Sequence, residues 1–245
     1  MARAPLTVDV VQQMIGETVY DPYGRVIGKL VSLESDIDGT VQQIVVETEN
    51  KDIKFIPSEA VEVSEGRIIV WPEWKVLAYK VLASYQRALK RLKGLEEMYS
   101  RNEIPAAVYQ ELRRKLNQSL ARVRDEAKKL KSLIKSRIDE IDDNNLKLDR
   151  AIANLKVSYM AGEISEKAYK TAIEYLRSAK DSNTRELEDL KKTGAKLESL
   201  ETGTIEISKT AKKKESKPAS REEKHEAKPP AIEGIQPIPV KVIEG

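Results

Sequence analysis

The residues best suited to specific binding form the last stretch of the chain, PPAIEGIQPIPVKVIEG. In an extended chain Ile238, Val240 and Val242 alternate, so their side chains share one face. Pro237 and Pro239 forbid helix and hold extended dihedral angles before binding, which lowers the entropy lost on ordering. These properties are typical of a peptide that adds as a strand to a sheet edge. The tail docks either on the protein's own sheet or, as its tether favours, on an outside partner.

Residues for catalysis or metal binding are scarce. The chain has no cysteine, which excludes disulfides, thiol chemistry and Cys-ligated zinc sites. Its one histidine is His225. Asp36 and Asp38 resemble the start of a calcium loop, but Thr40 stands where a third acidic or amide ligand is needed, so we expect a hairpin turn. No motif pairs a nucleophile with a base, and no glycine-rich phosphate loop is present. The sequence therefore predicts no enzyme, no cofactor and no metal site.

A basic stretch occupies residues 111–137, with ten Lys or Arg against three acids, and the acidic run of residues 139–143 follows it. Three interpretations stay open: a solvated helix face, a stagger between neighbouring rods that sets basic against acidic segments, or contact with DNA phosphates or anionic lipid. The candidate contacts are Lys115, Arg122, Arg124, Lys128, Lys129, Lys131 and Lys135.

Composition indicates long solvated helices instead of one thick core. Of 245 residues, 34% are charged and 5% aromatic, and Phe55 is the one phenylalanine. The net charge of +3 is too small to indicate nucleic-acid binding on its own. Because no apolar run approaches the roughly 18 residues of a membrane span and the N-terminus lacks a signal-peptide core, we expect a cytoplasmic protein.

Residues 1–72 have the pattern of a small antiparallel β-barrel. Five runs read as strands, separated by turn signals: GETVY, RVIGKLVSLES, TVQQIVVE, DIKFI and RIIVW. Gly28, inside a strand, predicts a bulge or a close backbone approach. The opening GETVYDPYGRVIGK, with the later IPSEAVEV and GRIIV, resembles the PRC-barrel family. That resemblance implies a binding or scaffolding barrel without catalytic residues.

Residues 73–202 have the periodicity of a coiled coil, with apolar residues spaced by three and four. Trp71 and Trp74 flank the start of the first helix, and we expect them to pack the barrel against it, with self-association as the alternative. Asn145 lies on the apolar seam, where a polar residue fixes register and oligomeric state.

A sixty-residue repeat predicts two breaks in the coil. YSRNEIPAAVYQELRRKL, from residue 99, matches YMAGEISEKAYKTAIEYL, from residue 159, so Asn102 corresponds to Gly162 and Pro105 to Ser165. These residue types suit a helix end followed by a helix start, so breaks are expected near 102–105 and 162–165. The three helices either fold back as hairpins, which the exact repeat favours, or continue as one rod.

Residues 203–228 have the composition of a disordered linker, and residues 229–245 form the partner-binding motif. The order of barrel, coiled coil, linker and short Pro/Ile/Val motif resembles the archaeal cell-division family CdvA. The resemblance implies a cytoplasmic scaffold, peripheral to the membrane at the division site, which polymerises and recruits the ESCRT-III-like protein CdvB. The implied contacts in the tail are Ile232, Ile235, Pro237, Ile238, Pro239, Val240 and Val242.

Two functions therefore compete. The first is a division scaffold that forms homo-oligomers or filaments and recruits CdvB through its tail. The alternative is a coiled-coil filament protein that organises DNA or membrane through the basic stretch, which leaves the tail unexplained.

Overall fold

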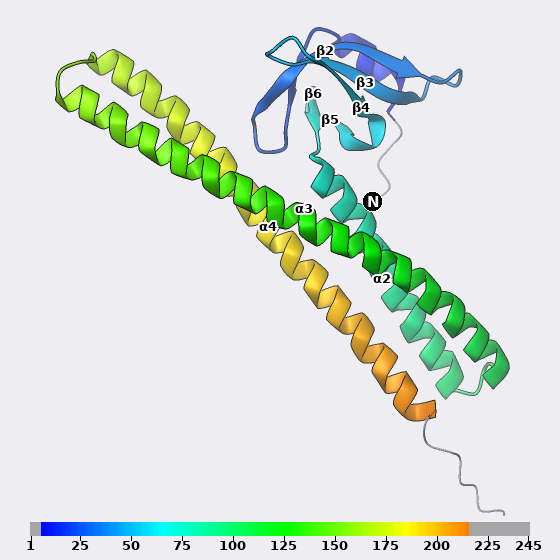
Figure 1. Cartoon of the computed structure of the whole chain (residues 1–245). Helices are drawn as coiled ribbons and strands as arrows, with labels where there is room; N and C mark the ends of the chain where they lie inside the picture. Colours follow the sequence, from blue (N-terminus) through cyan, green and yellow to red (C-terminus); the bar gives the residue numbers. More distant parts are fainter. Residues whose placement is uncertain (1–5, 216–245) are drawn as a thin grey trace, which may run out of the picture.

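The computed structural model describes residues 6–215. An N-terminal β domain is followed by three long helices (Figure 1). The expected multidomain α+β architecture, a small β domain joined to a helical coiled coil, is confirmed. Within residues 6–215, no helix is both long enough and apolar enough to span a membrane.

The β domain is one curved sheet of six strands in the order β4-β3-β2-β1-β6-β5. A short helix α1 and a 3₁₀ turn precede it, and a second 3₁₀ turn (Ser58–Ala60) separates β4 from β5. The elements are α1 (Val8–Val11), β1 (Thr18–Tyr20), β2 (Val26–Ser35), β3 (Val41–Glu47), β4 (Ile53–Pro57), β5 (Val61–Ser64) and β6 (Arg67–Val70).

Two features of the sheet differ from the sequence prediction. There are six strands instead of five, because the four-residue β5 was too short to stand out. One pairing, β1 with β6, is parallel and sets Val19 beside Ile68, a long-range pairing that no local pattern announces. Among residues 6–215 no ladder joins β4 to β5, so these two strands form the ends of the sheet and the expected hydrogen-bonded closure is not seen.

The interior of the sheet is a small apolar core. Its buried side chains come from β1, β2, β3, β5 and β6, and α1 adds Val11. Gly28 is a close approach, as predicted: a Cβ there would lie 2.1 Å from the carbonyl oxygen of Glu47. The turn before β3 is also as predicted, since the Gly39 N–H donates to the Asp36 carbonyl at 3.0 Å and Gly39 has φ of 79°.

The helices fold back on one another, so the hairpin arrangement is confirmed and the single rod is wrong (Figure 1). They are α2 (Glu73–Ser100), α3 (Ala106–Met160) and α4 (Glu166–Glu215). We call the part where all three pack together the bundle. The remaining hairpin of α3 and α4, residues 142–181, we call the arm.

The two corners between the helices match the sixty-residue repeat. Asn102 and Gly162 both have positive φ, 58° and 75°, as expected just after a helix end. The rings of Tyr99 and Tyr109 stack with their centroids 4.2 Å apart. At the second corner the rings of Tyr159 and Tyr169 stack with their centroids 4.5 Å apart. Ser165 accepts a hydrogen bond from the Ala168 N–H at 3.3 Å, as an N-cap does.

The C-terminal helix is longer than its sequence suggested. α4 continues to Glu215, whereas we expected a helix end at 202 and a disordered linker from 203. The run after residue 203 contains several Lys residues and two Glu residues, which favour helix, and its first proline is Pro218. High charge alone therefore did not end the helix.

Candidate functional site

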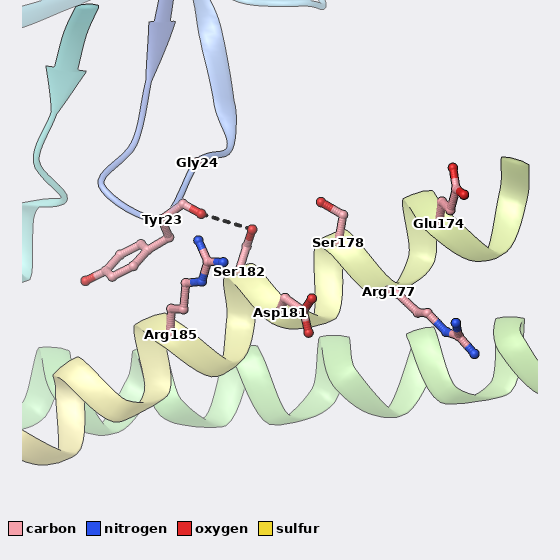
Figure 2. Close-up of a pocket in the computed structure, with 8 residues that line it drawn as sticks. All are labelled: Tyr23, Gly24, Glu174, Arg177, Ser178, Asp181, Ser182 and Arg185. Carbon is pink, nitrogen blue, oxygen red and sulfur yellow. Dashed lines mark hydrogen bonds between the residues drawn. The ribbon is translucent and has the colours of Figure 1, made fainter. Parts of the chain in front are cut away.

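The β1–β2 loop fixes the β domain to the helices. Asp21 organises this loop, because its Oδ1 accepts hydrogen bonds from the backbone N–H groups of Tyr23 and Arg25 at 2.9 and 2.8 Å. Tyr23 is buried against α4: its hydroxyl donates to Asp189 at 2.8 Å, and its carbonyl accepts from the Ser182 hydroxyl at 3.1 Å (Figure 2). The sequence analysis had interpreted this loop only as a turn.

Glu186 is the centre of a buried ionic network under that loop. Its side chain is 1% exposed and accepts hydrogen bonds from Arg137 at 2.8 and 3.0 Å and from Arg25. Trp74 Nε1 also donates to it, at 3.4 Å. Burial raises the pKa of Glu186, but the hydrogen bonds from Arg137 and Arg25 outweigh this effect, so the pKa lies below its ordinary value. Glu186 is therefore a carboxylate.

The network joins three segments that are distant in sequence. Arg25 comes from the β domain, and its guanidinium also donates to Asn183 Oδ1 at 2.8 Å. Asn183 in turn donates to Asn145 of α3 at 2.8 Å, at the base of the arm, so the polar seam residue that we expected to set an oligomer pairs within the chain. A buried ion pair, such as that of Glu186 with Arg25 and Arg137, contributes little net stability compared with apolar packing, but it favours the one arrangement in which the charges meet.

The tryptophans pack where we expected. Trp74 is buried in the helical core together with Tyr23. Trp71 donates from Nε1 to Glu62 at 2.8 Å, and the Lys75 ammonium lies 4.6 Å from its ring centroid. Both rings therefore fix the β domain on α2.

An open hollow lies beside the docked loop, between Gly24 and the outer face of α4 (Figure 2). Acidic and basic side chains alternate along this face: Glu174, Arg177, Asp181 and Arg185. All four are exposed. Within residues 6–215, no group of three or more acidic or histidine side chains could hold a metal ion.

The seven predicted DNA or lipid contacts are all exposed on α3. Three of them form ion pairs: Lys115 with Glu111 at 2.6 Å, Lys128 with Asp125 at 3.2 Å, and Lys131 with Glu201 of α4 at 2.6 Å. In the described part of the chain the other four have no ion pair: Arg122, Arg124, Lys129 and Lys135.

Two other basic residues of the stretch do not face solvent freely. Arg113 is buried in the bundle, and Arg137 binds Glu186. The surface of α3 is thus less basic than its sequence suggests.

The predicted tail contacts lie outside the described residues. They are Ile232, Ile235, Pro237, Ile238, Pro239, Val240 and Val242.

Sequence reasoning missed the network around Glu186. The signal available was polar residues within the apolar spacing of α4, since Asn183 and Glu186 stand between Leu176 and Leu190. Their partners Arg25 and Arg137 lie far away in the chain, so no local pattern could identify them.

Comparisons with known proteins agree with this architecture. Residues 73–220 match the family model described as the CdvA-like coiled-coil domain. The chain is also 38% identical over 238 residues to Cell division protein A of Sulfolobus acidocaldarius, covering 97% of this chain and 98% of that protein. The similarity therefore extends through the β domain, the three helices and the tail, and the chain belongs to the CdvA family.

Proposed function

We propose that this protein is a non-enzymatic scaffold of archaeal cell division. It self-assembles, and its tail recruits an ESCRT-III-like protein of the CdvB type to the membrane at the division site. The observation that carries this proposal is a relative named as a cell division protein that matches 97% of the chain. The architecture is compatible with it, because a small β domain fixed to long packed helices offers extended surfaces for binding other chains.

In this proposal, the tail is the segment that binds the partner protein. Ile238, Val240 and Val242 share one face of an extended chain and fill pockets, while the backbone pairs with the partner's sheet edge. Many tails on one assembly raise the effective concentration of binding sites, so each contact need not be strong.

Calorimetric titration tests this function directly. The probe is the peptide of residues 229–245, added to the C-terminal domain of a CdvB-like protein from the same cell. We expect saturable binding that Ile238→Asp abolishes, because the charge would enter an apolar pocket. Lys241→Asp is the matched control, because in an extended strand residue 241 would face the side opposite to Ile238, and its loss should leave binding within about threefold.

Assembly is measured separately, by light scattering of the full chain. The Ile238→Asp chain should assemble like the unchanged chain. Normal recruitment by Ile238→Asp would show that the contact face is wrong.

A second candidate is an assembly that binds DNA or anionic lipid. It is favoured by the exposure of Arg122, Arg124, Lys129 and Lys135, which have no ion pair among residues 6–215. If it holds, the combined change of Arg124 and Lys135 to Ala lowers DNA affinity and reduces the salt slope by about two. An unchanged salt slope would exclude these residues as phosphate contacts.

A further inference from the structure

Eight charged side chains form one line along α4, which we call the charged stripe. They follow one another at spacings of three or four residues, and the sign of the charge changes at every step. In order they are Glu166, Lys170, Glu174, Arg177, Asp181, Arg185, Glu188 and Lys192. All eight are exposed, and the middle four project from α4 beside the docked β1–β2 loop (Figure 2).

The charged stripe runs nearly parallel to the axis of α4. Its spacings repeat as four, four and three, so the pattern has a period of eleven residues. Over that length an α-helix turns only about 20° more than three full turns. The charges therefore stay on one side of α4, where a straight helix laid alongside can meet all of them.

Most members of the charged stripe have no ion pair within the chain. Neighbours at this spacing often pair along their own helix, as Glu111 and Lys115 do at 2.6 Å. In the stripe Glu166 and Lys170 form such a pair, also at 2.6 Å. Within the described residues 6–215, the six members from Glu174 to Lys192 have no ion pair. Their charges are available to a partner.

The alternation of sign decides which partner fits. A uniformly acidic partner, such as a nucleic acid, or a uniformly basic one would repel half of the stripe. A helix that carries the same alternation fits when it is offset by one charge, and α4 of a second copy is such a helix. Two copies related by a two-fold axis would present this helix to each other in the antiparallel direction.

We propose that the charged stripes of two copies pack antiparallel, about a two-fold axis level with Ala179. In this register, facing residues lie equally far before and after Ala179 in the chain, within one residue. Every charge then faces an opposite charge. The pairs, each formed twice, are Arg177 with Asp181, Glu174 with Arg185, Lys170 with Glu188 and Glu166 with Lys192.

Other registers are less favourable. An axis level with Asp181 would set like charges opposite one another, since Asp181 would face its own copy and Arg177 would face Arg185. Axes level with Tyr175 or Asn183 give opposite pairs again, but for only six of the eight charges. A parallel pair offset by one charge is also complementary, but it does not close about a two-fold axis.

The open hollow beside the loop leaves room for the partner. It is lined by Gly24 of the loop and by the middle four members of the charged stripe. A Cβ at Gly24 would meet nothing within 4 Å, so the loop leaves this part of the stripe uncovered.

The contact is electrostatic, and it is weak between free molecules. Exposed ion pairs contribute little each and are screened by salt. The contact gains strength where many copies are held together. It deepens the proposed scaffold function and rests on it, since it names one surface through which copies join.

Cysteine crosslinking of the full chain tests the register, because the natural chain has no cysteine. In the proposed pair, Glu174 and the partner's Arg185 differ in height along the helix axis by about 1.5 Å, whereas Asp181 and the partner's Arg185 differ by about 12 Å. An oxidised mixture of Glu174→Cys and Arg185→Cys chains should therefore form mixed disulfide dimers about ten times faster, or more, than a mixture of Asp181→Cys and Arg185→Cys chains. Equal rates would overturn the proposal. So would the reverse order, which a parallel pair or an axis level with Asn183 would give.

Charge reversal tests the ion pairs themselves. Arg177→Glu should raise the dissociation constant of the pair by about fivefold or more, because it turns two attractive contacts into repulsive ones. Adding Asp181→Arg to the same chain should restore the constant to within about threefold, since opposite charges face each other again. Sedimentation equilibrium at low ionic strength, where exposed charges are least screened, measures the constant. A double variant that stays as weak as Arg177→Glu would overturn the proposal.

Arg150→Glu is the matched control for net charge. Arg150 is exposed on α3, outside the charged stripe, and its reversal changes the net charge by the same amount. It should change the dissociation constant by less than about twofold. An effect as large as that of Arg177→Glu would show that net charge is the cause and would overturn the proposed contact.

Arg177→Glu also separates this contact from the scaffold function as a whole. It should raise the concentration needed for assembly by about threefold or more while leaving titration of the tail unchanged. Unaltered assembly would overturn the α4 contact and leave the scaffold standing. An unchanged chain that forms the crosslinked pair, but neither assembles further nor binds through its tail, would support the contact and overturn the scaffold.

Discussion

The bundle and the arm share helices α3 and α4, yet these helices bury their apolar seams to different degrees in the two parts. In the bundle, Leu120 and Leu130 of α3 are almost completely buried, because α2 covers the groove between α3 and α4. In the arm, Leu148 and Leu155 hold equivalent seam positions but are only half-buried. The same spacing of apolar residues thus gives two different environments, and the number of packed helices decides which.

The outer surface of the arm shows the same difference. Near its tip Met160 is 86% exposed, and Val157 and Tyr175 are exposed as well. A two-helix coil has only one interface in which to bury apolar groups, whereas a three-helix bundle has an enclosed core. The arm therefore depends on fewer contacts than the bundle.

Truncating one leucine in the bundle and one in the arm tests the difference in burial, and it has the largest expected effect. Leu130→Ala, at a position that is 0% exposed, should lower the free energy of unfolding by about 3 kcal/mol. Leu155→Ala in the arm should lower it by only about 1 kcal/mol, because less apolar area is lost. Urea unfolding followed by circular dichroism measures both. Equal losses would mean that the arm is covered in solution by further copies.

Glu186 allows a second test of the difference between the bundle and the arm, because it lies next to their junction. Glu186→Gln removes the charge that Arg25 and Arg137 share and should lower the free energy of unfolding by about 2 kcal/mol, less than a fully buried pair since both arginines are partly exposed. Glu188→Gln, an exposed neighbour on α4, is the control and should change it by less than about 0.5 kcal/mol.

The same variant has a distinct pH dependence. The folded-state pKa of Glu186 lies below its ordinary value of 4.5. Its contribution to stability is therefore present above that value and is lost as the pH falls through the lowered pKa. The difference in unfolding free energy between the unchanged chain and Glu186→Gln should shrink on acidification below about pH 4.5. A difference that is constant with pH would show that the carboxylate charge is not the cause.

Sequence alone predicted the features of this fold that are local or repeated. The corners at Asn102 and Gly162 followed from residue types that tolerate positive φ, combined with an exact spacing of sixty residues. The apolar seam followed from its period. Each of these signals lies within a few residues of the structure that it specifies.

The features that could not be predicted depend on residues far apart in the chain. The parallel pairing of β1 with β6 and the attachment of Arg25 to Glu186 join segments about 50 and 160 residues apart. Composition also misled at the end of α4, because a highly charged segment without proline is compatible with helix as well as with disorder. The difference in burial between the arm and the bundle could not be predicted either, because the apolar periodicity does not reveal how many helices pack around one seam.

The course of α4 gives the molecule a direction. It passes back along α2, where a side chain at Gly203 would lie 3.6 Å from Leu89, and it ends beside the first corner (Figure 1). With 50 residues, α4 spans about 75 Å, so it ends that far from the tip of the arm. In the assembly proposed above, copies that stack in one orientation would all direct the C-terminal ends of their α4 helices the same way.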